Sequence, residues 1–213
     1  MQTIISEQSP QEKADHEAGH YVVATALKIP HRTAFVTIEN SAPAEDGGVE
    51  GGCCALVFEP EPTPAQFGVY SMAGMTAQMN GILIRGGEDQ AVALERVRLG
   101  GHVDFQNFRE ALGPDADDAP YTLRAFHILQ SNWRLVVVLG DALKEHGTLY
   151  REEAEMILEA ELKGSKKILD ELAVYRTARR EIQPPAQLRE SRPGMKWFES
   201  LQNFMRREGR SFT

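Results

Sequence analysis

Two histidines and one glutamate of the sequence stand at a spacing that can hold a metal ion. They occur as His16-Glu17-Ala18-Gly19-His20, and in a helix residues i and i+4 lie on one face, about one turn apart. Two imidazole nitrogens placed in this way can bind one zinc ion. Glu17, about 100° further round the helix, is predicted to lie beside the ion.

The residue types in this motif fit the hydrolysis of a peptide bond. Neutral histidines leave the charge of a zinc ion intact, so that the ion can lower the pKa of a bound water to about 7. A carboxylate beside that water can take its proton and return it to the leaving amine. We therefore expect His16 and His20 to be metal ligands and Glu17 to be the catalytic base.

A capped, apolar helix is predicted to carry the motif. Ser9, Pro10 and Glu12 form a capping pattern at its start, and Pro30 predicts that it ends near Lys28. Most of its interior residues are apolar on every side, so the helix should lie inside the domain. Because two imidazoles and a carboxylate are costly to bury without a partner, this position favours a bound metal.

The other elements predict a mainly α fold with a small β-sheet, which is the α+β class. Two short β-rich segments, Phe35–Ile38 and Cys53–Phe58, flank a loose stretch from Ser41 to Gly52. A second capping pattern at Thr63 predicts a helix that reaches about Ile84. Further helices are expected at about 91–99, inside a loop of residues 85–101, at 103–112, at 121–146, and after a cap at Thr148.

A catalytic zinc site usually has three protein ligands, so one more is needed. The metzincin motif would place Gly at position 23 and His at position 26, but Val23 and Ala26 stand there, which excludes that class. A nearby glutamate of the thermolysin kind is not expected, because residues 30–60 have a strand and loop pattern. The distant candidates are Asp104, His102, His127, Glu88 and Asp89.

The surroundings of the motif resemble the start of the peptidase domain of FtsH-type zinc metalloproteases. The matching segments are Glu12-Lys13-Ala14-Asp15 before the motif, and Val22-Val23-Ala24, Ile29-Pro30 and Val36-Thr37-Ile38 after it. Three later segments are similar to the family's G-G-R-A-A-E-E helix, G-A-S-N-D-L turn and L-L-E-K-E-T-L turn, namely Met72–Gln78, Gly100–Phe105 and Leu143–Leu149. The resemblance covers about residues 11–160.

The resemblance implies a zincin-like helical peptidase domain over residues 1–160, with Asp104 as the third zinc ligand. The helix expected near Val103 would also hold that carboxylate on a rigid element, whereas His102 lies in a glycine loop. We assign Asp104 over His102 as the ligand, and consider His102 as a residue that lies near the zinc ion and steadies the reacting oxyanion. A substrate backbone is expected to pair with the strand Val36, Thr37 and Ile38 by β-addition.

FtsH-type proteins carry an ATPase module and membrane helices ahead of the peptidase, and we expect neither here. The sequence contains no G-x-x-x-x-G-K-[ST] phosphate-binding loop, so it resembles a stand-alone peptidase domain that acts without ATP on peptides or unfolded proteins. Residues 161–213 are expected to form a basic, helical C-terminal extension, with one apolar face at Trp197, Phe198, Leu201 and Phe204. Because members of that family form hexamers, the resemblance implies a homo-oligomer as one form of this chain.

Composition excludes several other classes of protein. The apolar fraction of 42% is too high for a disordered chain, and the longest aliphatic run, Leu135–Leu139, is too short for a membrane span. Residues 1–160 carry a charge of −13 and residues 161–213 one of +5, and the acidic part argues against nucleic acid as a partner of the main body. Adjacent Cys53 and Cys54 offer no disulfide framework, and the N-terminus has no secretory pattern, so a cytoplasmic protein is expected.

These observations leave three hypotheses about function. The leading one is a zinc-dependent endopeptidase. The second is a zinc-containing partner-binding module without general proteolytic turnover, and the third is a regulatory protease that cuts one repressor. Glu17 favours a peptidase, because a structural metal site does not need a base.

Overall fold

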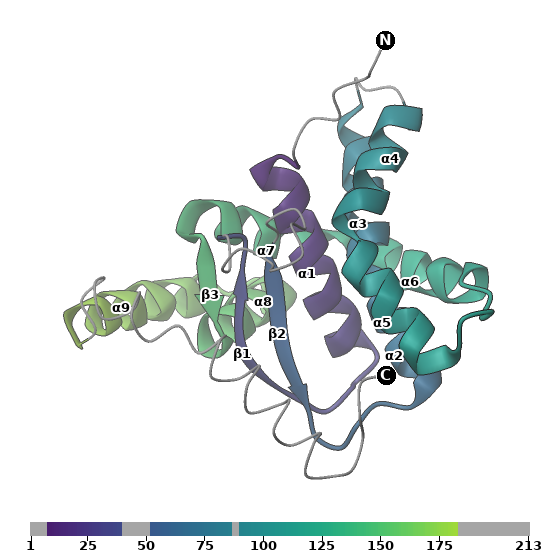
Figure 1. The fold of residues 1–213 in the computed structure, drawn as a ribbon. Helices are drawn as coiled ribbons and strands as arrows, with labels where there is room; N and C mark the ends of the chain where they lie inside the picture. The colour runs from purple at the N-terminus through teal and green to yellow at the C-terminus, as the bar shows by residue number, and fades with distance from the viewer. Residues whose placement is uncertain (1–7, 40–51, 87–89, 183–213) are drawn as a thin grey trace. The chain divides into compact units, whose positions relative to one another are not determined.

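The computed structural model describes residues 8–39, 52–86 and 90–182. The chain divides into two units after Lys166, and each is described by itself. The predicted loop from Ser41 lies mostly outside the described residues, as does the predicted apolar face at Trp197, Phe198, Leu201 and Phe204. In the first unit, helices pack against a small antiparallel sheet, which confirms the mainly α, α+β prediction (Figure 1).

Helix α1 (Pro10–Ala26) begins and lies as its sequence predicts. The Ser9 hydroxyl accepts a hydrogen bond from the Glu12 N–H, and the Glu12 carboxylate accepts one of 2.6 Å from the Ser9 N–H. The residues from Ala14 to Ala24 are all buried. The helix ends two residues before the predicted Lys28, whose φ of 52° lies in the left-handed region and turns the chain away.

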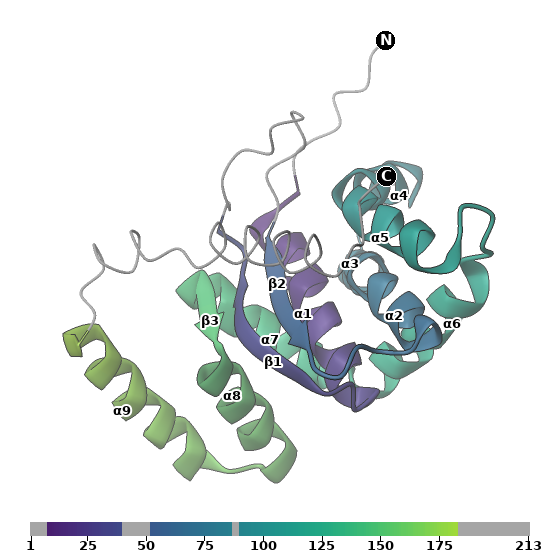
Figure 2. The ribbon, with the colours of Figure 1, turned by 60° about the horizontal axis from the view of Figure 1, so that its bottom comes forward.

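Three strands form the sheet, in the order β2-β1-β3. They are β1 (His31–Thr37), β2 (Cys53–Phe58) and β3 (Thr148–Tyr150), and both pairings are antiparallel. Strand β1 is longer than predicted and lies at the centre, with Val36 opposite Cys54 on one side and Leu149 on the other. In both views α1 lies between the strands and helix α3 (Ala73–Arg85) (Figures 1 and 2).

The prediction of two long helices is wrong, because the structure has a pair of shorter helices in place of each. Helix α2 (Pro64–Ser71) ends at Met72 before α3 begins, and α6 (Ala119–Ser131) ends at Asn132 before α7 (Trp133–His146) begins. The Asn132 side chain donates a hydrogen bond of 2.8 Å to the Ile128 carbonyl, which competes with the regular helical bonds. Thr148 also does not cap a helix: it lies in β3, and α8 (Arg151–Lys163) starts after Tyr150.

Small residues bring α1 and α3 close together. A Cβ atom added at Gly19 would lie 2.4 Å from the Ala77 Cβ and 3.0 Å from the Ala73 carbonyl oxygen, so neither backbone could stay in place. On its far side α3 packs against α4 (Gln90–Gly100), where Ile82, Ala93 and Val97 form an apolar cluster with Met75 and Met79. Helix α7 packs against another side of α1, which is therefore enclosed.

Helix α4 is also tied to the start of α1 by a buried ion pair. The Arg96 guanidinium donates through Nε and Nη2 to one oxygen of Glu12, at 2.8 and 2.6 Å. Both side chains are less than one tenth exposed. This contact matters for the site, because α4 leads directly into α5 (His102–Leu112), which carries Asp104.

The remaining described helix, α9 (Lys166–Ile182), covers the first part of the predicted C-terminal extension. Leu172 is buried, whereas Leu169 and Val174 are exposed. None of the described helices is long and apolar enough to cross a membrane.

Candidate metal centre

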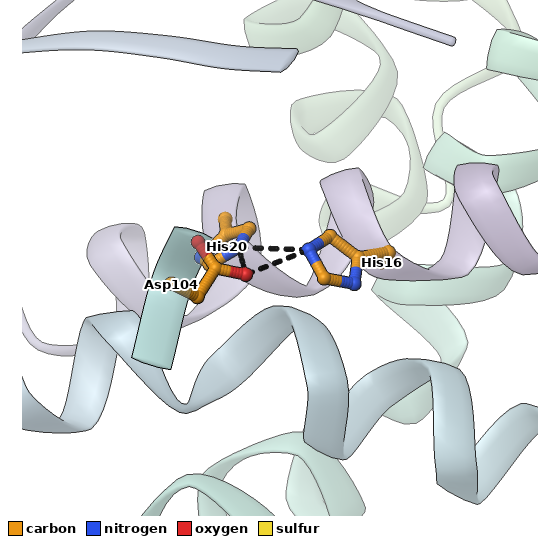
Figure 3. A group of neighbouring side chains, drawn as sticks. All are labelled: His16, His20 and Asp104. Carbon is orange, nitrogen blue, oxygen red and sulfur yellow. Dashed lines mark hydrogen bonds and ion pairs between the residues drawn. The ribbon is translucent and has the colours of Figure 1, made fainter. Parts of the chain in front are cut away.

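The two motif histidines lie one turn apart on α1 and direct their Nε2 atoms to the same point. These two nitrogens are 3.3 Å apart (Figure 3). The side chains are 9% and 4% exposed for His16 and His20, so neither ring is solvated. Two bare imidazole lone pairs this close would repel each other unless a proton or a cation lay between them.

Asp104 completes the group from a distant part of the sequence. Its Oδ2 atom lies 2.8 Å from His16 Nε2 and 3.1 Å from His20 Nε2 (Figure 3). Asp104 is in the first turn of α5, which begins at His102, and Gly101 alone separates this helix from the end of α4 at Gly100. A Cβ at Gly101 would lie 2.0 Å from Met75 Cγ, so glycine lets the start of α5 approach α3.

The spacing of the three donor atoms fits a small tetrahedral cation. Two ligands at about 2.05 Å from a zinc ion, separated by the tetrahedral angle, are about 3.3 Å apart. The observed separations of 2.8, 3.1 and 3.3 Å are close to that value. Among the described residues, His16, His20 and Asp104 form the group whose donor atoms lie within 4.8 Å of one another. Two imidazoles and one carboxylate would leave a fourth position open, as in a catalytic zinc site.

The outer ring nitrogens of both histidines also have partners. His20 Nδ1 donates a hydrogen bond of 3.0 Å to the Tyr70 backbone carbonyl. His16 Nδ1 lies 3.4 Å from Oε1 of Gln78, a residue of α3. Because both partners are oxygen acceptors, each Nδ1 carries the hydrogen and each Nε2 keeps its lone pair for a metal. Such partners orient histidine ligands in metal sites.

A glycine of α3 makes room for the two rings. A Cβ added at Gly74 would lie 2.4 Å from the Nε2 atoms of both His16 and His20. Sequence reasoning did not assign a role to Gly74 or Gln78, although both lie in the segment Met72–Gln78 that resembles the family's helix. The small residues of that segment were the available signal, because they allow close helix packing.

Glu17 lies beside the three donors and is not one of them. Its side chain is buried against the start of β2: a Cβ at Gly52 would lie 2.8 Å from Glu17 Oε1. Burial raises the pKa of Glu17 to about 8 in the metal-free protein, although His16 and a hydrogen bond from the Cys54 backbone oppose the rise. A carboxylate with this pKa takes up a proton near neutral pH.

The charges of the site are arranged for a cation. Burial opposes the ionisation of Asp104, but the histidines beside it hold the pKa of its carboxyl well below the usual range. Burial lowers the pKa of His20, but the nearby Asp104 carboxylate raises it above the ordinary value. The same attraction that holds a proton on His20 can hold a metal ion between these groups.

The other proposed ligands are not brought to this point. His102 is exposed and stands two residues before Asp104, about 200° round α5, so the structure does not place it among the ligands. His127 lies on α6, where it lines a separate open pocket with Leu123 and Asn132. Glu88 and Asp89 lie outside the described residues.

The prediction that a substrate pairs with Val36, Thr37 and Ile38 is wrong for the backbone of β1. Both sides of Val36 and Thr37 are already paired, with β2 and with β3, and the Ile38 N–H donates to the Gly147 carbonyl. Among the described strands, β2 is the edge that lies next to Glu17. Sequence patterns predict strands but not their order in the sheet.

The two cysteines lie on this edge strand and are free. Burial and the nearby Glu17 carboxylate raise the pKa of Cys53 to about 12 and that of Cys54 well above its usual value. Both thiols therefore stay protonated near neutral pH, and neither supplies a thiolate ligand.

Comparison of the chain with known proteins adds no assignment: no family model matches it, and no curated protein is similar to it.

Proposed function

We propose that this chain is a zinc-dependent endopeptidase that hydrolyses peptides or unfolded proteins without ATP. The observation that carries the proposal is the arrangement of four side chains. Three donors, from His16, His20 and Asp104, surround one point, and a fourth side chain, Glu17, is held beside them without belonging to the group. A purely structural site would have no use for Glu17.

The donor set favours zinc over harder cations. Imidazole nitrogens suit zinc and other late transition metals, whereas magnesium and calcium prefer oxygen ligands. A zinc ion held here would supply a Lewis acid and lower the pKa of a water molecule. Gly74, the Tyr70 carbonyl and Gln78 would keep the two rings in the orientation that such an ion needs.

The role of Glu17 follows from its surroundings. Because burial raises its pKa to about 8 in the metal-free protein, its carboxylate has a high affinity for a proton. A nearby divalent cation would lower that pKa and leave the group ionised, ready to accept a proton. Glu17 would then take the proton from the attacking water and deliver it to the leaving amine.

Strand β2 offers a place for an extended substrate backbone. It is an edge of the described sheet, and its first half lies beside Glu17. A peptide that adds to this edge by β-pairing would pass close to the metal point, which fits peptides and unfolded segments rather than folded domains. The resemblance of residues 11–160 to the peptidase domain of FtsH-type enzymes, with a zincin-like fold, supports the same proposal.

Cleavage of unfolded casein by the purified chain tests this function. We expect cleavage that a zinc chelator abolishes, that added zinc restores, and that needs no nucleotide. Stoichiometric zinc without cleavage of casein or any native partner would support the partner-binding module instead. Cleavage of a single native protein, with casein untouched, would support the regulatory protease.

A further inference from the structure

Gln78 is a buried amide with an unusual set of partners. The residue is completely buried in α3. Its Oε1 atom accepts a hydrogen bond of 2.9 Å from Gln8 Nε2 and faces His16 Nδ1 at 3.4 Å. Its own Nε2 atom is buried without a hydrogen-bond partner among the described residues.

This arrangement is costly for the fold alone. A buried N–H group that makes no hydrogen bond loses its interactions with water and gains nothing in return. An apolar side chain of similar size would avoid that loss. The oxygen of Gln78, by contrast, is placed where it can act on His16, so the benefit of this amide lies at the metal centre.

We propose that Gln78 is a positioning residue that holds His16 in the tautomer able to bind a divalent cation of the zinc type. An acceptor at Nδ1 keeps the hydrogen on that nitrogen, and the lone pair of Nε2 then faces His20 and Asp104. The proposal rests on the metal site of the proposed function, and not on peptidase activity.

Gln8 fixes the orientation of the Gln78 amide. Its donated hydrogen bond selects the oxygen of Gln78, and not the nitrogen, for the side that faces His16. Gln8 in turn packs against the end of α4: a Cβ at Gly100 would lie 1.8 Å from Gln8 Nε2. The turn that leads to Asp104 therefore contacts the same chain of amides that orients His16.

His20 provides a comparison inside the same site. Its Nδ1 partner is the backbone carbonyl of Tyr70, which a side-chain substitution leaves in place. Only His16 depends on a side chain for its acceptor. Substitution of Gln78 should therefore affect the affinity for metal without removing any ligand.

Zinc dissociation constants, measured by competition with a chromophoric chelator, test the proposal. We expect Gln78→Leu to weaken zinc binding by about 10- to 100-fold. Gln78→Glu, which keeps an oxygen of the same reach, should bind zinc at least as well as the wild type. Gln8→Ala should weaken binding by a smaller factor. Gln106→Leu, an exposed glutamine of α5, is the matched control and should change nothing.

Thermal unfolding of the metal-free variants separates positioning from a structural role. Gln78→Leu removes the unpartnered buried N–H group, but it also removes the acceptor of Gln8 Nε2 and His16 Nδ1. These two effects oppose each other, so the metal-free midpoint should stay close to that of the wild type. A loss of zinc affinity without a loss of stability is the expected result. Equal zinc affinity for Gln78→Leu and the wild type would overturn the proposal, and so would equal weakening by Leu and Glu. If the wild type itself does not bind zinc, both this proposal and the proposed function fail. The two outcomes named above differ from that one, because in both of them the wild type still binds zinc.

Discussion

His16 Nε2 and Asp104 Oδ2 lie 2.8 Å apart, although the two residues are separated by 88 positions in the sequence. Helix α1 supplies the histidine and α5 supplies the carboxylate. Gly74 lets α3 approach the histidines of α1, and Gly101 lets the start of α5 approach Met75 of α3, which makes this contact possible. The candidate centre therefore exists only in the folded chain, and substitutions in the helices that do not carry ligands should affect it.

The identity of the third ligand can be tested by comparing two neighbours on α5. Asp104→Ala should weaken zinc binding by more than about 100-fold, because it removes a donor atom. Loss of a residue that only hydrogen-bonds to a metal ligand typically weakens binding by about 10- to 100-fold. His102→Ala should keep wild-type affinity, since His102 is exposed and faces another direction. Metal titration of both variants is the measurement. Full zinc in Asp104→Ala with loss in His102→Ala would reverse the assignment.

The space around the imidazoles gives a prediction for Gly74. In Gly74→Ala the new methyl group would meet both Nε2 atoms at 2.4 Å and displace the rings from the metal point. We expect loss of bound zinc, measured by elemental analysis after gel filtration. Gly140→Ala is the control, because a Cβ at that buried helical glycine would meet its nearest neighbour at 3.6 Å, an ordinary contact. Equal zinc content in both variants would show that the rings do not need this space.

The pKa of Glu17 predicts how the stability of the metal-free protein depends on pH. Because burial raises that pKa from its ordinary 4.5 to about 8, the folded chain keeps a proton that the unfolded chain has already released. The free energy of unfolding should therefore fall as the pH rises between these values, by up to about 1.4 kcal/mol per pH unit from this group.

Urea unfolding of the metal-free wild type and Glu17→Gln, from about pH 5 to about pH 8, measures this contribution. Glutamine does not titrate, so the variant should lose less stability than the wild type over that range. Identical slopes for the two proteins would show that Glu17 is not held in its neutral form by burial.

The sequence predicts those parts of the site that depend on residues close together in the chain, and misses those that depend on contacts between distant segments. His16, Glu17 and His20 lie within five residues of one another, and helix geometry alone places them as predicted, whatever packs against the helix. Asp104 came from the resemblance of its segment to a known family. Gly74 and Gln78 were missed, because their roles depend on how closely α3 packs against α1.

The fold shows the same distinction between local and distant effects. The capping patterns at Ser9 and Thr63 are local, and both helices start where they predict. The breaks at Met72 and Asn132 contain neither proline nor glycine, so no strong local signal marked them. The central position of β1 depends on pairing with the distant β3, which no local pattern encodes.

Nucleotide should have no effect on the purified chain. The sequence contains no phosphate-binding loop of the G-x-x-x-x-G-K-[ST] type, and the proposed chemistry needs only the metal and Glu17. Initial rates of casein cleavage with and without ATP and magnesium should agree within error. A reproducible stimulation by ATP would count against a peptidase that acts by itself.

The most direct measurement of the central claim is zinc content and casein cleavage of Glu17→Gln beside the wild type. In the proposed mechanism Glu17 transfers the proton, and His16, His20 and Asp104 bind the metal. Glu17→Gln should therefore keep stoichiometric zinc while its rate of cleavage falls by about 10²- to 10⁴-fold. A variant that loses its zinc, or that cleaves casein as fast as the wild type, would contradict this division of roles.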